Sequence, residues 1–187
     1  MRHLDLVAVG TGVFAATLIP QLAYWYRITH SAFIDPYRMP GQHLDLLHPH
    51  LEGVLFSTSK GLFFWTPLLL LAVVGIPLLR RTAPPVFLGT VAYLIVAVWV
   101  VSSWSVWSYG YSFGMRALID EMPVFALGLA ALVEAVRGAV ARRLLIAVIA
   151  VSSLVAIQGM YAYWHSLIPG DGTTWHERLA SLEHWPI

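Results

Sequence analysis

The residues best suited to chemistry form the stretch HPHLE, which begins at His48 and lies in the most polar segment of a very apolar chain. It places the imidazoles of His48 and His50 beside the carboxylate of Glu52, and side chains of these types bind Zn²⁺. Pro49 favours extended backbone at the residue before it, and alternate side chains of an extended segment project to one side. A divalent metal held by the two histidines, with Glu52 or Asp45 as a further ligand, is therefore one hypothesis.

A second interpretation of this stretch involves no metal. The sequence contains no recognised ligand spacing such as HExxH, and a zinc site needs a third and usually a fourth ligand. Histidines in the headgroup region of a membrane can instead hydrogen-bond to phosphate or backbone groups. We favour this interpretation, in which His48, His50 and Glu52 belong to a polar loop.

Aromatic residues mark a second candidate site in WSVWSYGYSFGMRALIDEMP, residues 104–123. Trp104, Trp107 and Tyr111 offer flat faces on which a sugar ring or an isoprenoid phosphate can stack beside a basic residue. The competing explanation is an aromatic belt at the membrane interface, interrupted by a flexible turn.

Two acidic residues, Asp120 and Glu121, follow in the same stretch and are expected about one helical turn inside the membrane boundary. A carboxylate at that depth usually faces a bundle interior or a wet cavity, which makes both residues candidates for a catalytic role. The competing explanation is an ion pair on the helix surface between Arg116 and Asp120, which are four residues apart.

Two basic residues, Lys60 and Arg116, directly precede apolar segments and are candidates for binding a phosphate. Arginine offers a planar bidentate fork to a phosphate, whereas lysine offers a point charge. A snorkelling anchor at the membrane boundary is the competing explanation for each residue.

The composition of the chain indicates that lipid surrounds the helices that position these residues. Hydrophobic residues make up 58% of the 187-residue chain and charged residues only 11%, and the mean hydropathy is +0.71. A soluble domain has about 25% charged residues, and a globule of this size cannot hide so much apolar surface. The net charge of +1 leaves no electrostatic footprint for nucleic acid. The composition predicts an all-α fold, a polytopic transmembrane helix bundle whose first partner is the lipid bilayer.

Five apolar segments have the length that a bilayer demands, roughly 20 residues of helix. They form a bundle over residues 1–164, which is followed by a tail at residues 165–187. In the tail, Thr174 and Glu177 have the spacing of a capping box, which predicts a short amphipathic helix on the membrane surface. The five predicted membrane helices cover residues 4–24, 61–79, 86–104, 117–136 and 144–164.

Basic residues predict the orientation of these helices. Arginines cluster in two short hinges, and the positive-inside rule places both hinges in the cytoplasm. The amino terminus of this multi-pass plasma (inner) membrane protein is then cytoplasmic, while the loops 27–60 and 105–116 and the tail lie outside. Glu134, three residues before Arg137, is expected to form a local ion pair with it. The hinge arginines are Arg80, Arg81, Arg137, Arg142 and Arg143.

Two loop patterns suggest a family. LFSTSKGLFFWTP at 55–67 fits L-F-S-x-x-x-G-L-F-x-x-x-P, and WSVWSYGYSFGMR at 104–116 fits W-x-x-W-x-x-G-x-S-x-G-x-R, followed by Asp120 and Pro123. Through these patterns, residues 20–135 resemble the C-terminal half of bacterial polytopic glycosyltransferases of the GT-C type. These enzymes are relatives of the dolichyl-phosphate-mannose-protein mannosyltransferases.

The resemblance implies a membrane enzyme that transfers a sugar from a polyprenyl-phosphate donor on the outer face. Enzymes of this family are longer, and the acidic residue they use lies in an earlier loop. We therefore expect a donor-binding portion that is incomplete for catalysis alone, with missing N-terminal helices or a partner subunit completing it. The residues assigned to the donor phosphate are Arg116 and Lys60, those assigned to the sugar are Trp104, Trp107 and Tyr111, and those assigned to the acceptor are His48, His50 and Glu52.

A function of another class competes with this one. A small non-catalytic integral membrane protein could serve as a scaffold or as a subunit of a membrane complex. A transporter is less favoured, because few charged residues lie inside the predicted helices and a coupling ion needs such residues along its path.

Overall fold

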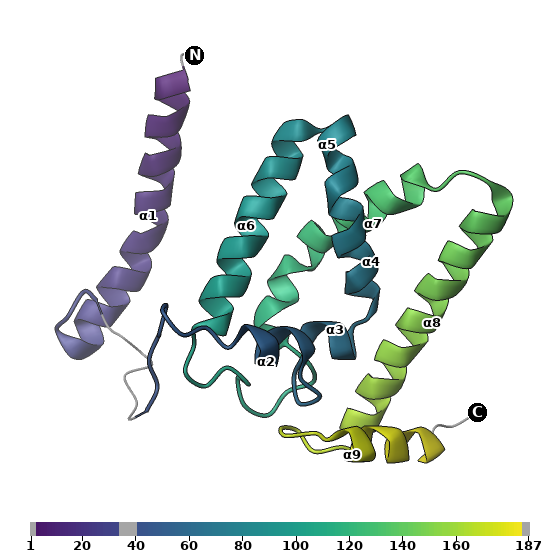
Figure 1. The fold of residues 1–187 in the computed structure, drawn as a ribbon. Coiled ribbons are helices and arrows are strands. Elements are labelled where there is room, and N and C mark those ends of the chain that lie inside the picture. Colours follow the sequence, from purple (N-terminus) through teal and green to yellow (C-terminus); the bar gives the residue numbers. More distant parts are fainter. Residues whose placement is uncertain (1–2, 34–40, 185–187) are drawn as a thin grey trace. The chain divides into compact units, whose positions relative to one another are not determined.

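A computed structural model of the chain describes residues 3–33 and 41–184, and these residues are helical or in loops (Figure 1). The chain divides into two compact units, residues 1–40 and 41–187. The described part of the first unit is mainly one helix, α1 (His3–Thr29), with Pro20 inside it. No strand occurs in the described ranges.

Three helices are long and apolar enough to cross a membrane. They cover Val7–Thr29 within α1, Pro84–Ser102 (α6) and Ala139–Trp164 (α8). Few of their side chains are buried by protein, and in a membrane such helices need no other cover because lipid contacts their apolar side chains. The predicted all-helical fold is confirmed for the described residues, and three helices have the length and composition of membrane spans, but the predicted number of five spans is not confirmed.

The predicted helix 61–79 is divided into several pieces. α3 ends before Thr66, and α4 begins after Pro67, whose ring has no N–H to donate to the preceding turn. Pro77 lies at the start of a short 3-10 helix, η1, where a missing N–H costs little. The pieces are α3 (Leu62–Trp65), α4 (Leu68–Gly75), η1 (Ile76–Leu78) and α5 (Leu79–Thr82).

The predicted helix 117–136 is also interrupted. It consists of a 3-10 helix, η2 (Arg116–Glu121), and an α-helix, α7 (Met122–Ala135). Leu118 has non-helical backbone angles inside η2, with φ −108° and ψ 17°. Pro123 lies in the first turn of α7, the position at which a helix best accepts proline. The predicted helices 61–79 and 117–136 are therefore mostly apolar, but neither is one regular helix.

α4 and α7 cross at two glycines that leave no room for a side chain. A β-carbon placed on Gly75 would lie 1.8 Å from the carbonyl oxygen of Gly128, and one placed on Gly128 would lie 2.2 Å from that of Ala72. Small residues at such crossings let helices in a membrane approach closely and gain van der Waals contact. Leu69 and Phe125 are buried in the core beside this crossing.

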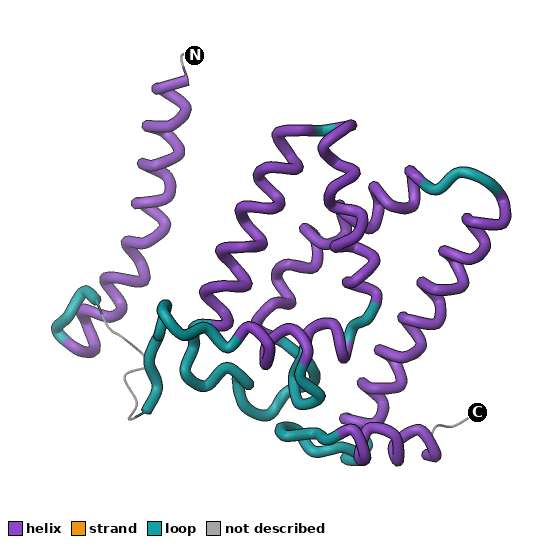
Figure 2. Tube along the Cα trace, in the orientation of Figure 1, coloured by secondary structure: helices purple, strands orange, loops and turns teal. Residues whose placement is uncertain are grey.

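The connections of residues 41–184 gather at two opposite ends of the helices, as the loops in Figure 2 show. One end holds the turn from α5 to α6 and the turn from α7 to α8, and the hinge arginines lie in these turns or in the helix ends next to them. The other end holds α2 (Leu51–Phe56) and the loops next to it. We call residues 41–61, 103–115 and 165–174 at this end the polar cap.

Hydrogen bonds join the three segments of the polar cap. The N–H of Asp45 donates to the carbonyl of Ser103 at 2.8 Å, and the N–H of Ser112 donates to that of Gly170 at 3.3 Å. Segments that lie far apart in the sequence therefore form one layer over the ends of the helices.

The tail forms the predicted short helix, α9 (Trp175–Ala180). The Thr174 hydroxyl accepts from the N–H of Glu177 at 3.3 Å, and the Glu177 carboxylate accepts from the N–H of Thr174 at 2.8 Å, so the predicted capping box is confirmed. Arg178 is buried and donates to the side chain of Gln158, which ties α9 to α8. Apolar side chains cover the exposed face of α9 and the turn that follows it: Trp175, Leu179 and Leu182.

Candidate functional site

Lys60 is completely buried at the centre of the polar cap. Its ammonium donates to the backbone carbonyls of Ser112 and Gly170, which belong to the other two segments of the cap. Burial lowers the pKa of this ammonium below its ordinary value of 10.5, the charge of Asp171 raises it, and Arg116 lowers it again. Lys60 therefore holds the three segments together, and its role as a phosphate ligand stays a prediction.

Asp171 faces Lys60 and was not singled out by the sequence. Its carboxylate accepts hydrogen bonds from the hydroxyls of Ser59 at 2.9 Å and Ser108 at 3.0 Å, and from the N–H of Gly172 at 2.9 Å. Burial alone would raise the pKa of Asp171, but these hydrogen bonds and the charge of Lys60 hold it below the ordinary value of 3.8. Its one local signal is a position between two glycines, which is typical of a turn.

A polar pocket of about 460 Å³ lies at the surface of the cap beside α2, and His50, Glu52 and Trp107 line it. The rings of His50 and Trp107 lie 6.4 Å apart with a tilt of 32° between their planes. A β-carbon at Gly53 would lie 3.0 Å from the indole of Trp107, so the glycine allows the indole to pack against α2. The structure thus brings together three residues that the sequence assigned to two separate clusters.

The other predicted stacking residues lie elsewhere in the cap. Trp104 pairs with Leu44 in an isolated β-bridge. Tyr111 is 84% exposed, and its ring lies against Gly170. Of the three aromatic residues, Trp107 is the one that lines the polar pocket.

His48 and His50 have different neighbours. His48 Nδ1 lies 2.9 Å from the carboxylate of Asp45, and this hydrogen bond lowers the pKa of Asp45, whereas His50 lies beside Trp107. Across residues 3–33 and 41–184, no three histidine, aspartate or glutamate side chains are grouped as a metal site requires. Metal binding by the two histidines has no supporting geometry and stays a prediction.

Arg116 and the two acids beside it differ in burial. Arg116 and Asp120 are exposed, and the described residues contain no ion pair between them. Glu121 is only 7% exposed, and in the described part of the chain its Oε2 has no hydrogen-bond partner. Its carboxyl group interacts with the hydroxyl of Tyr93 on α6. Because Arg116 is exposed and has no ion pair among the described residues, its guanidinium is available to an anion that approaches this end of the helices.

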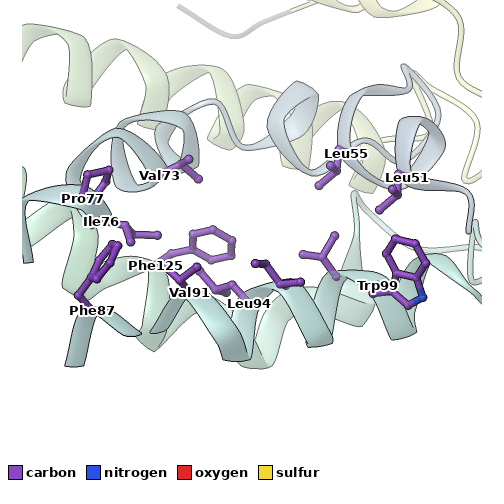
Figure 3. A pocket seen from close by; sticks show the side chains of 12 residues that line it. Leu51, Leu55, Val73, Ile76, Pro77, Phe87, Val91, Leu94, Trp99 and Phe125 are labelled. Atoms are coloured by element: carbon purple, nitrogen blue, oxygen red, sulfur yellow. The ribbon is translucent and has the colours of Figure 1, made fainter. Parts of the chain in front are cut away.

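An apolar groove of about 550 Å³ runs along α6 and opposite α2, α4 and η1 (Figure 3). Leu51, Leu55 and Trp99 line its end at the polar cap, while Phe87 and Pro77 line the end toward the arginine turns. Apolar side chains line it along its whole length. Its surface is thus suited to a hydrocarbon chain.

The apolar groove and the polar pocket adjoin at Leu51, which lines both. An amphiphilic molecule could place its hydrocarbon chain in the groove and its polar head beside the imidazole, carboxylate and indole of the pocket. An indole has a flat face of the kind on which sugar rings stack, and Arg116, exposed at the start of η2 directly after the cap, is of the residue type that binds phosphate. Comparison with protein-family models, curated proteins and solved structures found no match to the chain.

Proposed function

We propose that this chain is the donor-binding portion of a GT-C-like membrane glycosyltransferase that uses a polyprenyl-phosphate-linked sugar. The observation that carries the proposal is the meeting of the apolar groove and the polar pocket at Leu51. A prenyl chain is a run of methyl-branched isoprene units made only of hydrocarbon, which matches the apolar lining of the groove. Its head would then reach His50, Glu52 and Trp107, as a phospho-sugar requires.

Arg116, which directly follows the second segment of the cap, and several residues of the cap have roles in this proposal. Arg116 binds the donor phosphate, because its exposed guanidinium forms no ion pair within residues 3–33 and 41–184 and can offer a bidentate fork. Lys60 adds positive charge from within the cap while it holds the loops together. Trp107 stacks on the sugar, and Trp104 and Tyr111 are further candidates for that contact outside the pocket.

The chain offers fewer candidate residues in suitable positions for binding the acceptor and for the catalytic base than for binding the donor. His48, His50 and Glu52 border the space where an acceptor hydroxyl would arrive, and Asp120 and Glu121 are the candidates for a base. A base has to reach the hydroxyl that it deprotonates, and neither acid lines the polar pocket. We propose that further helices or a partner subunit complete the catalytic site.

The proposal includes five membrane crossings in the plasma membrane, with the polar cap outside. The two interrupted segments, 62–82 and 116–135, are each long enough to cross, since roughly 20 helical residues span a bilayer. Interrupted helices are tolerated in membranes where protein buries the break, and α4 and α7 pack on each other inside the bundle. The arginines at the end opposite the cap support a cytoplasmic position for that end.

Arg116→Ala is expected to weaken binding of a polyprenyl-phosphate-linked hexose by roughly 10-fold to 100-fold, because a charge-assisted hydrogen bond is worth about 1.5–3 kcal/mol. The binding measurement uses the whole chain in lipid nanodiscs together with any subunit that co-purifies with it. Arg116→Lys keeps the charge but loses the fork, so it should bind with intermediate affinity.

Arg142→Ala is the matched control, because it removes an exposed arginine at the opposite end of the bundle. It should bind the donor as the wild-type chain does. Equal affinity of the Arg116→Ala variant and the wild-type chain, or no measurable affinity of either, would remove the proposed function.

One observation favours the second candidate function, a non-catalytic subunit or scaffold. Glu121 is buried, its Oε2 lacks a partner among the described residues, and its neighbour Asp120 is exposed. Acidic side chains within membrane-spanning segments usually face the interior of a helix bundle and pair with another polar group there. A neighbouring membrane protein with a donor group at this point would satisfy Glu121 whether or not the chain binds a sugar donor.

A further inference from the structure

A second polar cavity lies at the end of the bundle opposite the polar cap. This pocket has a volume of about 340 Å³ and lies between the ends of α5 and α7. Arg81 lines it from the last turn of α5, Glu134 lines it from α7, and Arg137 follows the end of α7. Leu78 and two alanines of α7 form its apolar wall. Two guanidinium groups from different turns thus border one cavity.

The glycine crossing of α4 and α7 explains why these charges meet. Both helices run from the cap end toward the arginine turns (Figure 1). Arg81 follows Gly75 by six residues, and Glu134 follows Gly128 by six. Six residues rise about 9 Å along the α-helix α7 and slightly more from α4 through η1 into α5, because a 3-10 helix rises more per residue. Helices that touch at the glycines and continue in one direction deliver these side chains to the same depth.

Among the residues that the structure describes, none forms an ion pair with the arginines of this pocket. Within the described ranges no ion pair involves Arg81, Glu134 or Arg137, and the ion pair expected between Glu134 and Arg137 is absent. Arg80 is different, because its guanidinium lies 5.6 Å from the centre of the Phe87 ring and it does not line the pocket. The pocket therefore presents two guanidiniums and one carboxylate to a ligand.

We propose that this pocket binds the headgroup of a phosphatidylethanolamine-type phospholipid, with the phosphate on Arg81 and Arg137 and the amine beside Glu134. Basic pockets between membrane helices recognise lipid headgroups, and arginine holds phosphate through paired hydrogen bonds. A carboxylate between two arginines opposes a purely anionic ligand but fits a headgroup that carries both charges. The acyl chains would follow the apolar wall at Leu78 into the bilayer. This site is independent of the proposed function.

The test measures binding of dihexanoyl-phosphatidylethanolamine to the whole chain in detergent. Replacing Arg81 and Arg137 together by glutamine is expected to weaken binding by at least roughly tenfold, because both phosphate contacts are lost. Arg142→Gln with Arg143→Gln removes the same charge from nearby exposed positions outside the pocket and should leave binding unchanged. All four side chains are exposed, so both double variants should fold, and circular dichroism checks this.

Two further binding measurements identify which parts of the lipid the pocket recognises. Glu134→Gln should remove the preference for the ethanolamine lipid over the matching choline lipid, which has no N–H to donate. Free phosphoethanolamine should bind much more weakly than the lipid, since it lacks the chains. The proposal is overturned if the Arg81 and Arg137 double variant binds like the wild-type chain, if the control loses as much affinity, or if free phosphoethanolamine binds as tightly as the lipid.

Discussion

Replacing Gly75 by alanine is expected to destabilise the helix bundle by about 3 kcal/mol, the upper part of the range for overpacked cores. The added β-carbon would lie 1.8 Å from the carbonyl oxygen of Gly128. A backbone oxygen cannot rotate away as a side chain can, so α4 and α7 would have to separate. Their separation would also open the core around Phe125 and Ile76. The measurement is the free energy of unfolding in mixed micelles.

Gly89→Ala provides the matched control for this prediction. Gly89 lies within α6, and a β-carbon there would have no neighbour within 4 Å. Alanine should stabilise the helix by about 0.5–1 kcal/mol at such a position, because glycine loses more backbone entropy on folding. If both alanine variants changed the unfolding free energy alike, the close crossing of α4 and α7 would be contradicted.

Lys60→Met is expected to loosen the polar cap, at a cost of about 1.5–3 kcal/mol in its local stability for each hydrogen bond that the buried ammonium loses. Methionine fills a similar volume but cannot donate to the carbonyls of Ser112 and Gly170. Asp171 would also lose the charge that helps to keep its pKa low. Hydrogen exchange in residues 103–115 and 165–174 measures the effect as a large loss of protection.

His48→Ala is the control for the cap, since it removes a polar side chain that is 81% exposed. An exposed contact such as the hydrogen bond between His48 and Asp45 contributes about 0–1 kcal/mol, so protection in the cap should change little. Unchanged protection in the Lys60→Met variant would mean that the buried ammonium does not hold the loops together.

Local patterns in the sequence account for several features of this structure. Uninterrupted apolar runs predicted α6 and α8, and the spacing of Thr174 and Glu177 predicted the capping box of α9. Those signals act within one or two helical turns, where side-chain chemistry and backbone geometry are directly coupled. The gathering of the polar loops at one end also agrees with helices that alternate in direction.

Other features depend on contacts that no local pattern contains. The residues on both sides of Pro67 are mostly apolar, so an apolar window alone cannot show that the helix stops there. A basic residue at the start of an apolar segment gives the same sequence pattern in two different environments. It can face water, or it can face the carbonyls of distant loops, as Lys60 does. Asp171 gains its partners Ser59 and Ser108 only when three segments of the cap come together.

The central claim is that the polar cap and the arginine turns lie on opposite sides of a membrane. The chain has no cysteine, so single cysteines can be introduced at the exposed positions Leu47 and Tyr111 of the cap and at Thr82 and Ala139 near the turns. Labelling of intact cells with a membrane-impermeant maleimide should modify the first pair at once and the second pair only after permeabilisation. Labelling of both pairs from the outside, or of the turn positions alone, would contradict the account.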